Sequence, residues 1–140
     1  MSKGALGLTA GYWPEDVYRY LAVPGITLDD GLVARPGKRT PDRPALIGHQ
    51  GPVSYKQLIA DIDQVMKAVL TCLEGKSGRI VVALNDPLEV VRVVFGALKA
   101  RSTVFLMNVS LAPEVLAPQL QKFSPDFAIA DDAFRRVIQT

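Results

Sequence analysis

The sequence contains one cysteine and one histidine among its 140 residues. A single cysteine, Cys72, excludes an internal disulfide bond, and a reducing cytoplasm is therefore the expected compartment. His49 has no second histidine and no suitably placed cysteine to complete a zinc site. We interpret His49 as an exposed turn residue and Cys72 as a small core residue, with a nucleophilic role for Cys72 as the weaker alternative.

Long apolar runs and blocks of like charge are also missing. Every apolar run ends well before the roughly 18 residues of a membrane span, and the first residues are too weakly apolar for a signal peptide. Sixteen basic residues stand against 14 acidic ones, a net charge of +2, and they are scattered. We therefore expect no membrane span and no nucleic-acid partner. With 49% hydrophobic and 21% charged residues, the chain has the composition of one folded globular domain.

A glycine-rich phosphate loop is the third absence. Such a loop lies between a strand and a helix, where free backbone N–H groups meet the anion. The two turns in that position read Leu84-Asn85-Asp86-Pro87 and Ala130-Asp131-Asp132, without glycine and with carboxylates that repel phosphate. Asp131 is interpreted as a cap, and Asp61 and Asp63, two apart on a helix, as part of a solvated face. The sequence thus predicts no catalytic, no cofactor-binding and no metal-binding residue.

The chain is organised around a strand, a helix and a strand between Arg79 and Asn108. The first strand lacks period-2 alternation, a pattern typical of a strand covered on both faces. Asp86, Pro87 and Glu89 predict the helix start, as a cap, a first helical residue and a capping-box partner. Two strands joined by such a helix form a parallel βαβ unit. The predicted elements are the buried strand Arg79–Leu84, the helix Leu88–Ala100 and a second buried strand Thr103–Met107.

Further elements flank this unit on both sides. Ser54 begins the longest helix with a capping box, and that helix carries an apolar face as far as about Leu73. Pro118 predicts a kink or restart in a later helix. The other predicted elements are a short helix Ile26–Val33 limited by Gly31, Pro36 and Gly37, a strand Ala45–Gly48, a turn His49–Gly51, a returning strand Pro52–Ser54, a helix Pro113–Phe123 and a third parallel strand Phe127–Ala130.

Residues 1–25 have too many glycines and prolines for a long regular element, and we predict an extended arm. Its aromatic residues either pin the arm across the domain or contact a partner. Residues 26–140 are predicted to form the α/β domain. Strands alternating with helices indicate a doubly wound, mainly parallel sheet with helices on both faces. The aromatic and apolar residues of the arm are Tyr12, Trp13, Tyr18, Tyr20 and Leu21.

The order of short motifs resembles the beginning of the adenylate-forming superfamily, which comprises AMP-dependent acyl-CoA synthetases, aryl-acid ligases and luciferases. No motif is specific alone, but five follow one another at the family's spacing. Trp13-Pro14 and Val23 to Leu28 are also similar to the lead-in of acyl- and aryl-CoA ligases. The five motifs are Pro41 to Leu46, Ser54-Tyr55-Lys56-Gln57-Leu58, Gly78 to Val82 with Asn85, Leu98 to Ser102, and Phe105 to Ser110.

Some positions depart from the family pattern. Arg101 stands where the family usually has glycine, and Leu106 and Val109 stand where prolines are common. Pro36 and Gly37 interrupt what is normally a helix. These changes indicate a divergent member. The family's phosphate loop, its ribose-binding aspartate and its catalytic lysine all lie beyond this segment, so none of its functional residues is carried over.

The resemblance implies the N-terminal portion of an ATP-dependent, AMP-forming carboxylic-acid ligase, a structural scaffold that is inactive by itself. ATP, Mg²⁺ and CoA are implied for a full-length enzyme, and no cofactor for these 140 residues. The implied partner is the rest of the ligase or a partner subunit. The alternative is a complete non-catalytic module that docks on a partner chain. An uncovered sheet edge also predicts a homodimer of the isolated chain.

Overall fold

The computed structural model describes residues 25–134, so the predicted arm lies outside the described residues except for Gly25. The βαβ unit predicted from the sequence is confirmed. Asp86 caps its helix as predicted, because its Oδ1 accepts a hydrogen bond from the Leu88 N–H at 2.8 Å. Glu89 pairs instead with Arg92, so the capping box is not closed. The unit consists of β3 (Arg79–Ala83), α3 (Pro87–Lys99) and β4 (Thr103–Leu106).

The three described parallel strands lie in the order β4-β3-β5, with β5 at Phe127–Ala130. Both neighbours run parallel to β3, with Val81 opposite Phe105 on one side and Ala128 on the other. The central strand is completely buried from Ile80 to Ala83. The prediction that β4 is equally buried is wrong: Leu106 is 54% exposed. In the described sheet β4 has a neighbour on one side only.

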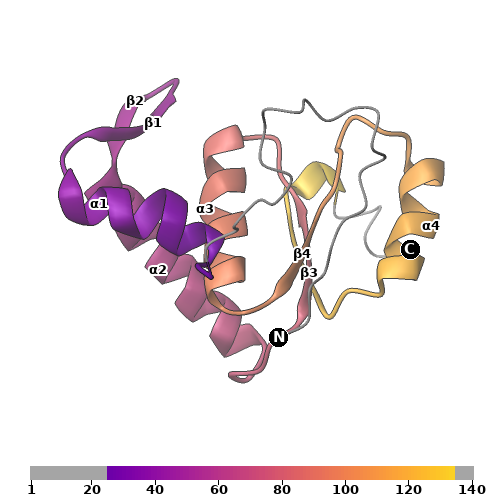
Figure 1. Ribbon diagram of the computed structural model, residues 1–140. Coiled ribbons are helices and arrows are strands. Elements are labelled where there is room, and N and C mark those ends of the chain that lie inside the picture. The colour runs from indigo at the N-terminus through magenta and orange to yellow at the C-terminus, as the bar shows by residue number, and fades with distance from the viewer. Residues whose placement is uncertain (1–24, 135–140) are drawn as a thin grey trace, which may run out of the picture.

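Helices cover both faces of this sheet, as predicted (Figure 1). Alternate side chains of β3 point to opposite faces. Ile80 and Val82 pack against α3 and against α2 (Tyr55–Cys72), the longest helix. Val81 and Ala83 pack on the other face, against α4 (Pro113–Phe123). The structure is therefore an α/β arrangement with a three-stranded parallel sheet between helical layers.

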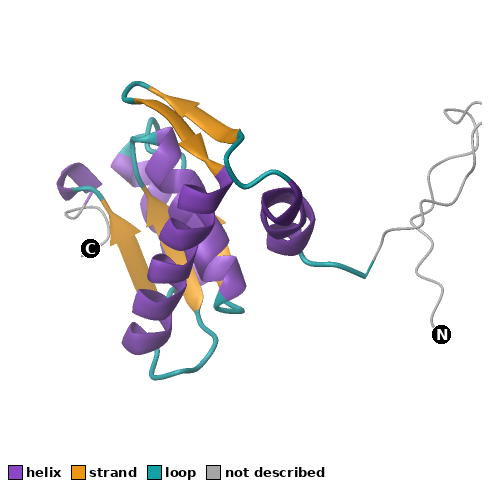
Figure 2. Ribbon diagram, turned by 90° about the vertical axis from the view of Figure 1, so that its left-hand side faces the viewer, coloured by secondary structure: helices purple, strands orange, loops and turns teal. Residues whose placement is uncertain are grey.

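A separate antiparallel hairpin precedes the longest helix, as predicted (Figure 2). Gly48 pairs with Gly51, which leaves His49 and Gln50 as the turn, and His49 is exposed as expected. The Ser54 hydroxyl accepts a hydrogen bond from the Gln57 N–H at 3.2 Å and so caps α2. The hairpin consists of β1 (Pro44–Gly48) and β2 (Gly51–Ser54).

The first described helix is longer than the sequence predicts. A π-helical segment, η1 (Asp30–Ala34), continues directly into α1 (Arg35–Arg39). Pro36 and Gly37 do not end the helix. Pro36 lacks an N–H, and in the wider π turn the preceding Arg35 N–H reaches the Asp30 carbonyl instead. Gly37 is buried against α2. A Cβ at this position would come within 2.4 Å of Ile59 Cδ1 on that helix.

Three described helices end with a non-glycine residue in the left-handed region: Ser124, with φ 49°, follows α4, and α2 and α3 end in one shared motif. After α2, Glu74 has φ 52°, and the Gly75 N–H donates to the Leu70 carbonyl at 2.7 Å. After α3, Arg101 has φ 59°, and the Ser102 N–H donates to the Ala97 carbonyl at 3.0 Å. Both ends are Schellman motifs. The geometry explains why a glycine suits the position of Arg101.

Two further expectations are wrong. Cys72 is exposed, because it lies at the edge of the apolar stripe in the last turn of α2, where Leu73 faces the core cluster instead. The expected restart of α4 at Pro118 is also wrong, since the helix runs unbroken to Phe123, whereas the alternative of a kink there stays a prediction. Its predicted stripe is confirmed, since Leu116 and Leu120 are buried and Phe123 packs against Phe105 with ring centroids 5.3 Å apart.

Candidate functional site

The carboxyl ends of the parallel strands are the place to look for a ligand site, because open α/β sheets bind ligands there. Since β3, β4 and β5 are parallel, their ends meet at one edge of the sheet. The segments that leave this edge are the turn 84–87, the loop 107–112 and the turn after Ala130. Their backbone N–H groups decide whether an anion can bind.

Asp131 joins the ends of two neighbouring strands. Its Oδ2 accepts the backbone N–H of Asn85 at 2.8 Å and the Asn85 side-chain amide at 3.0 Å. Asp131 also stands directly before the helical turn 132–134, the position predicted for the cap. Its backbone carbonyl accepts the Phe134 N–H at 2.9 Å, while its carboxylate reaches across to the turn after β3. The N–H of Asn85 is thus used within the chain.

Further amides at this edge are also occupied. Leu88 donates to the Asp86 carboxylate, and Pro87 has no N–H to offer. In the loop after β4, the Ser110 N–H donates to Asn108 Oδ1 at 3.1 Å. A triphosphate placed here would meet carboxylates where it needs donors. The amides named here are thus used within the chain, and the expectation that it holds no cofactor-binding residue stays a prediction.

The prediction that Asp61 and Asp63 belong to a solvated face is wrong. They do point apart, but each flanks the apolar stripe of α2 and pairs with a basic residue of α3. Asp61 Oδ2 lies 2.9 Å from Arg92 Nε, with both side chains largely buried. Asp63 Oδ1 lies 2.6 Å from Lys99 Nζ, in a more exposed position. These carboxylates fix one helix against the next.

Arg92 is the charged centre of this contact. Burial opposes its charge, but the hydrogen bond that Arg92 donates to Glu89 and the charges of Asp61 and Glu89 outweigh that effect and raise the pKa of the Arg92 guanidinium. The sequence analysis missed Arg92. The signal was present, since polar residues border the apolar stripes of two consecutive helices, but their pairing depends on how the helices cross.

The remaining candidates from the sequence stay apart from one another. His49 lies exposed in the hairpin turn, and Cys72 is exposed at the end of α2. Within residues 25–134, no three potential ligands among histidine, cysteine, aspartate and glutamate come together to hold a metal ion. In the same range, every helix falls short of the length and apolarity needed to cross a bilayer. The prediction of no site residue in the whole chain stays a prediction.

Solved structures similar to this chain are CoA ligases and related proteins. A benzoate CoA ligase from Burkholderia xenovorans LB400 matches 79% of this chain at 21% identity, with a TM-score of 0.69. The o-succinylbenzoate CoA synthetase MenE from Bacillus subtilis, solved with AMP, matches 77% at 20% identity, with a TM-score of 0.71. VinN, solved with L-aspartate, matches 81% at 27% identity, with a TM-score of 0.69.

The chain spans only part of these proteins: 22% of the benzoate CoA ligase, 29% of MenE and 32% of VinN. No protein-family model and no curated protein matches the sequence. The solved structures support the predicted resemblance at the level of the fold: over about four-fifths of its length, this chain has the fold of a segment of the benzoate CoA ligase and of MenE.

Proposed function

We propose that these residues are the N-terminal portion of an ATP-dependent, AMP-forming carboxylic-acid ligase of the acyl- or aryl-CoA synthetase type. The observation that carries the proposal is the asymmetry of the match. About four-fifths of this chain corresponds to less than a third of the benzoate CoA ligase, of MenE and of VinN. In this reading the segment is a scaffold, and the groups that handle ATP and the acid belong to other parts of the protein.

The carboxyl edge of the sheet supports the scaffold role. Asp131 and Asp86 accept the amides of Asn85 and Leu88, which are the donors that a phosphate would need. The bonds from Asn85 to Asp131 also tie the end of β3 to the end of β5. The edge therefore connects the ends of the strands, and we assign no chemical step to it.

We further propose that the sheet is part of a larger doubly wound sheet, and that 26–140 is one part of a larger AMP-binding domain. Both outer strands, β4 and β5, have a described neighbour on one side only. Exposed apolar side chains stand beside β4, where added structure would cover them. They are Leu106 at 54% exposure, Leu111 at 39% and Val115 at 48%.

The cofactors follow from the similar proteins. MenE from Bacillus subtilis has been solved with ATP and a magnesium ion, and with a CoA-containing product analogue. We extend ATP, Mg²⁺ and CoA to a full-length protein that contains this segment. ATP would convert the acid to an acyl-adenylate, which then passes to CoA or another thiol. The segment itself would supply neither the nucleotide site nor the metal site.

The direct test is the reading frame that encodes the chain. The proposal expects coding sequence to continue past Thr140 into a loop rich in glycine, serine and threonine that ends in lysine. The full-length product should then catalyse acid-dependent exchange of pyrophosphate into ATP, whereas the 140-residue chain should not. A continuation without such a loop, or a full-length product inactive with every acyl and aryl acid tested, would contradict the proposal.

A second candidate is a non-catalytic module, or one subunit of a split enzyme, that docks on a partner chain. The exposed apolar side chains beside β4 favour it as much as they favour a longer chain. A stop codon directly after Thr140 would select this candidate. Co-purification of the chain with a second polypeptide that carries the phosphate loop would then identify the split enzyme.

A further inference from the structure

The outward face of the first described helix carries a stripe that the scaffold role does not use. Leu28, Leu32, Arg35 and Arg39 follow one another at spacings of four, three and four, so they align along one side of the helix. Leu28 is 63% exposed, Leu32 58%, and the Arg35 side chain 54%. The opposite side packs on α2 through the buried Val33. Apolar groups occupy one end of the stripe and guanidinium groups the other.

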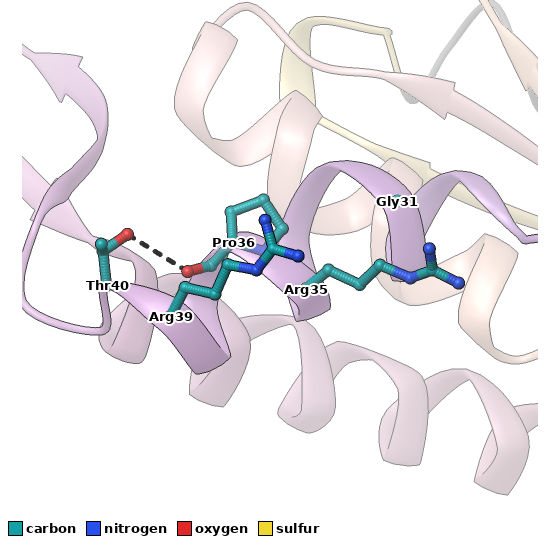
Figure 3. A pocket seen from close by; sticks show the side chains of 5 residues that line it. All are labelled: Gly31, Arg35, Pro36, Arg39 and Thr40. Atoms are coloured by element: carbon teal, nitrogen blue, oxygen red, sulfur yellow. Dashed lines mark hydrogen bonds between the residues drawn. The ribbon is translucent and has the colours of Figure 1, made fainter.

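Figure 3 shows how the two arginines lie: both side chains extend along the outside of the helix toward Gly31, over a shallow hollow. The hollow has a volume of about 390 Å³ and is lined by Gly31, Arg35, Pro36, Arg39 and Thr40. All five residues come from a single helix and its end, so the hollow cannot enclose a small molecule. It suits a side chain that a larger partner inserts.

The charge at the basic end of the stripe is not balanced within residues 25–134. Asp30 pairs with Arg35 at 2.9 Å, but Lys38, Arg39, Arg43 and Lys56 make no ion pair with a described residue. Lys38 and Arg39 end the preceding helix, and Arg43 and Lys56 lie in neighbouring backbone segments, because the Tyr55 N–H donates to the Arg43 carbonyl and the Lys56 N–H to the Pro41 carbonyl. Asp42 is the one carboxylate in that turn. The described residues therefore leave this surface with an excess of positive charge, which an acidic partner would neutralise.

We propose that this face, from Leu28 to Arg39 with the neighbouring Arg43 and Lys56, docks an acidic segment of a partner protein that has apolar side chains at one end. The basic end of the face would attract the acidic residues of the partner, and the two exposed leucines would pack against its apolar side chains. An anionic membrane is a poorer match. A helix that lies in a membrane surface carries its apolar side chains along one whole face, whereas here they end at Leu32. The proposal does not depend on the ligase assignment.

The test uses a random library of displayed peptides about four helical turns long. The library is selected on the intact chain and counter-selected on the double variant Arg35→Glu/Arg39→Glu. The expected result is enrichment of peptides with several Asp or Glu residues at one end and Leu, Ile or Phe at the other. An absence of enrichment, or enriched peptides that bind the double variant equally well, would overturn the proposal.

Fluorescence anisotropy of the best enriched peptide then assigns the surface. Arg35→Glu/Arg39→Glu should weaken binding roughly tenfold or more, and Leu32→Ser about threefold. The matched control is Lys67→Glu/Lys122→Glu, which reverses two exposed cations elsewhere and should change binding less than about twofold. Circular dichroism verifies that every variant is folded. If the control pair weakened binding equally, general charge attraction would explain the binding, and the proposal would be contradicted.

Vesicles containing phosphatidylserine supply the remaining comparison. The proposal expects the chain to stay in the supernatant when such vesicles are sedimented at about 0.1 M salt. Sedimentation that Arg35→Glu/Arg39→Glu abolishes would show that the stripe binds lipid headgroups, and the protein-docking proposal would be wrong.

Discussion

Asp131 accepts both the backbone N–H and the side-chain amide of Asn85, at 2.8 Å and 3.0 Å. The two residues are 46 positions apart, and their contact joins the ends of β3 and β5. In many α/β proteins the amides at such an edge are directed to an anionic ligand. Here the chain supplies the anion itself, which is the physical reason for treating the segment as scaffold.

Replacing Asp131 tests this contact. Asp131→Ala removes the acceptor for two donors of Asn85, and we expect the free energy of unfolding to fall by about 1 kcal/mol, because the site is partly open to water. Urea denaturation monitored by circular dichroism measures the change. Asp42→Ala, at an exposed carboxylate in the turn before β1, is the control and should leave stability unchanged. Equal losses in the two variants would mean that the strand link contributes nothing.

Arg101 provides a stabilising prediction. It has φ 59° at the end of α3, a conformation that a Cβ disfavours and glycine adopts freely. Arg101→Gly should raise the free energy of unfolding by about 1 kcal/mol. Arg101→Ala removes the same charge but keeps the Cβ, and it should give little of this gain. If the alanine variant were as stable as the glycine variant, charge and not backbone strain would be the cause.

The crossing of α2 and α3 at Gly96 should tolerate no side chain. A Cβ on Gly96 would lie 2.4 Å from Val65 Cγ1 and 3.2 Å from the Ile62 carbonyl oxygen, which is backbone. We expect Gly96→Ala to lower the free energy of unfolding by about 2 kcal/mol, since the helices must separate. Gly25→Ala is the matched control, because a Cβ there has nothing within 4 Å. A thermal melt of Gly96→Ala equal to wild type would refute the close packing.

Arg92 tests the ionic part of the same contact. Arg92→Ala leaves the largely buried Asp61 without its cation, and a loss of about 2 kcal/mol in the free energy of unfolding is expected. Lys99→Ala removes the more exposed partner of Asp63 and should cost less than about 1 kcal/mol. Equal losses in the two variants would count against the difference in burial.

The pH dependence of the Arg92 contribution has a definite sign. The pKa of Arg92 is raised in the folded chain, so its contribution is fully present below the pKa of the unfolded chain and disappears only as the pH rises through the folded value. Both lie above the range of ordinary buffers. The difference in unfolding free energy between wild type and Arg92→Ala should therefore not change with pH across the neutral range.

The open side of β4 predicts self-association of the isolated chain. Its edge is unpaired within the described sheet, and Leu106 is 54% exposed. We expect light scattering to detect dimers at about millimolar concentration, and Leu106→Lys to shift the sample to monomers, because charge on an edge strand blocks pairing. The exposed Ile47 on the hairpin offers a control, Ile47→Lys, which should leave the dimer intact. A wild-type chain that is monomeric at that concentration would contradict this prediction.

Most of the fold could be predicted from the sequence, because helix caps and strand patterns depend on side chains that are only a few residues apart. The cap at Asp86, the cap at Ser54 and the buried run of β3 all follow from neighbouring side chains and are confirmed. The predictions failed where the outcome depends on contacts between elements that are far apart in the sequence. The pairing of Asp61 with Arg92 depends on how two helices cross, and the exposure of Leu106 depends on the order of strands.

Pro36 shows a different kind of failure. A proline normally ends a helix because it lacks an N–H and crowds the preceding turn. The π turn at Asp30–Ala34 accommodates it, because the extra residue widens the backbone there. No sequence pattern predicts such a turn. The docking stripe proposed above exists only because the helix continues to Arg39.

The central claim is that this segment supports a ligase without holding its nucleotide. Isothermal titration calorimetry of the purified 140-residue chain with ATP and Mg²⁺ tests it most directly. The account predicts no saturable heat. Tight, stoichiometric binding of ATP that Asp86→Asn or Asp131→Asn alters would place the triphosphate at the turn after β3 and contradict the account.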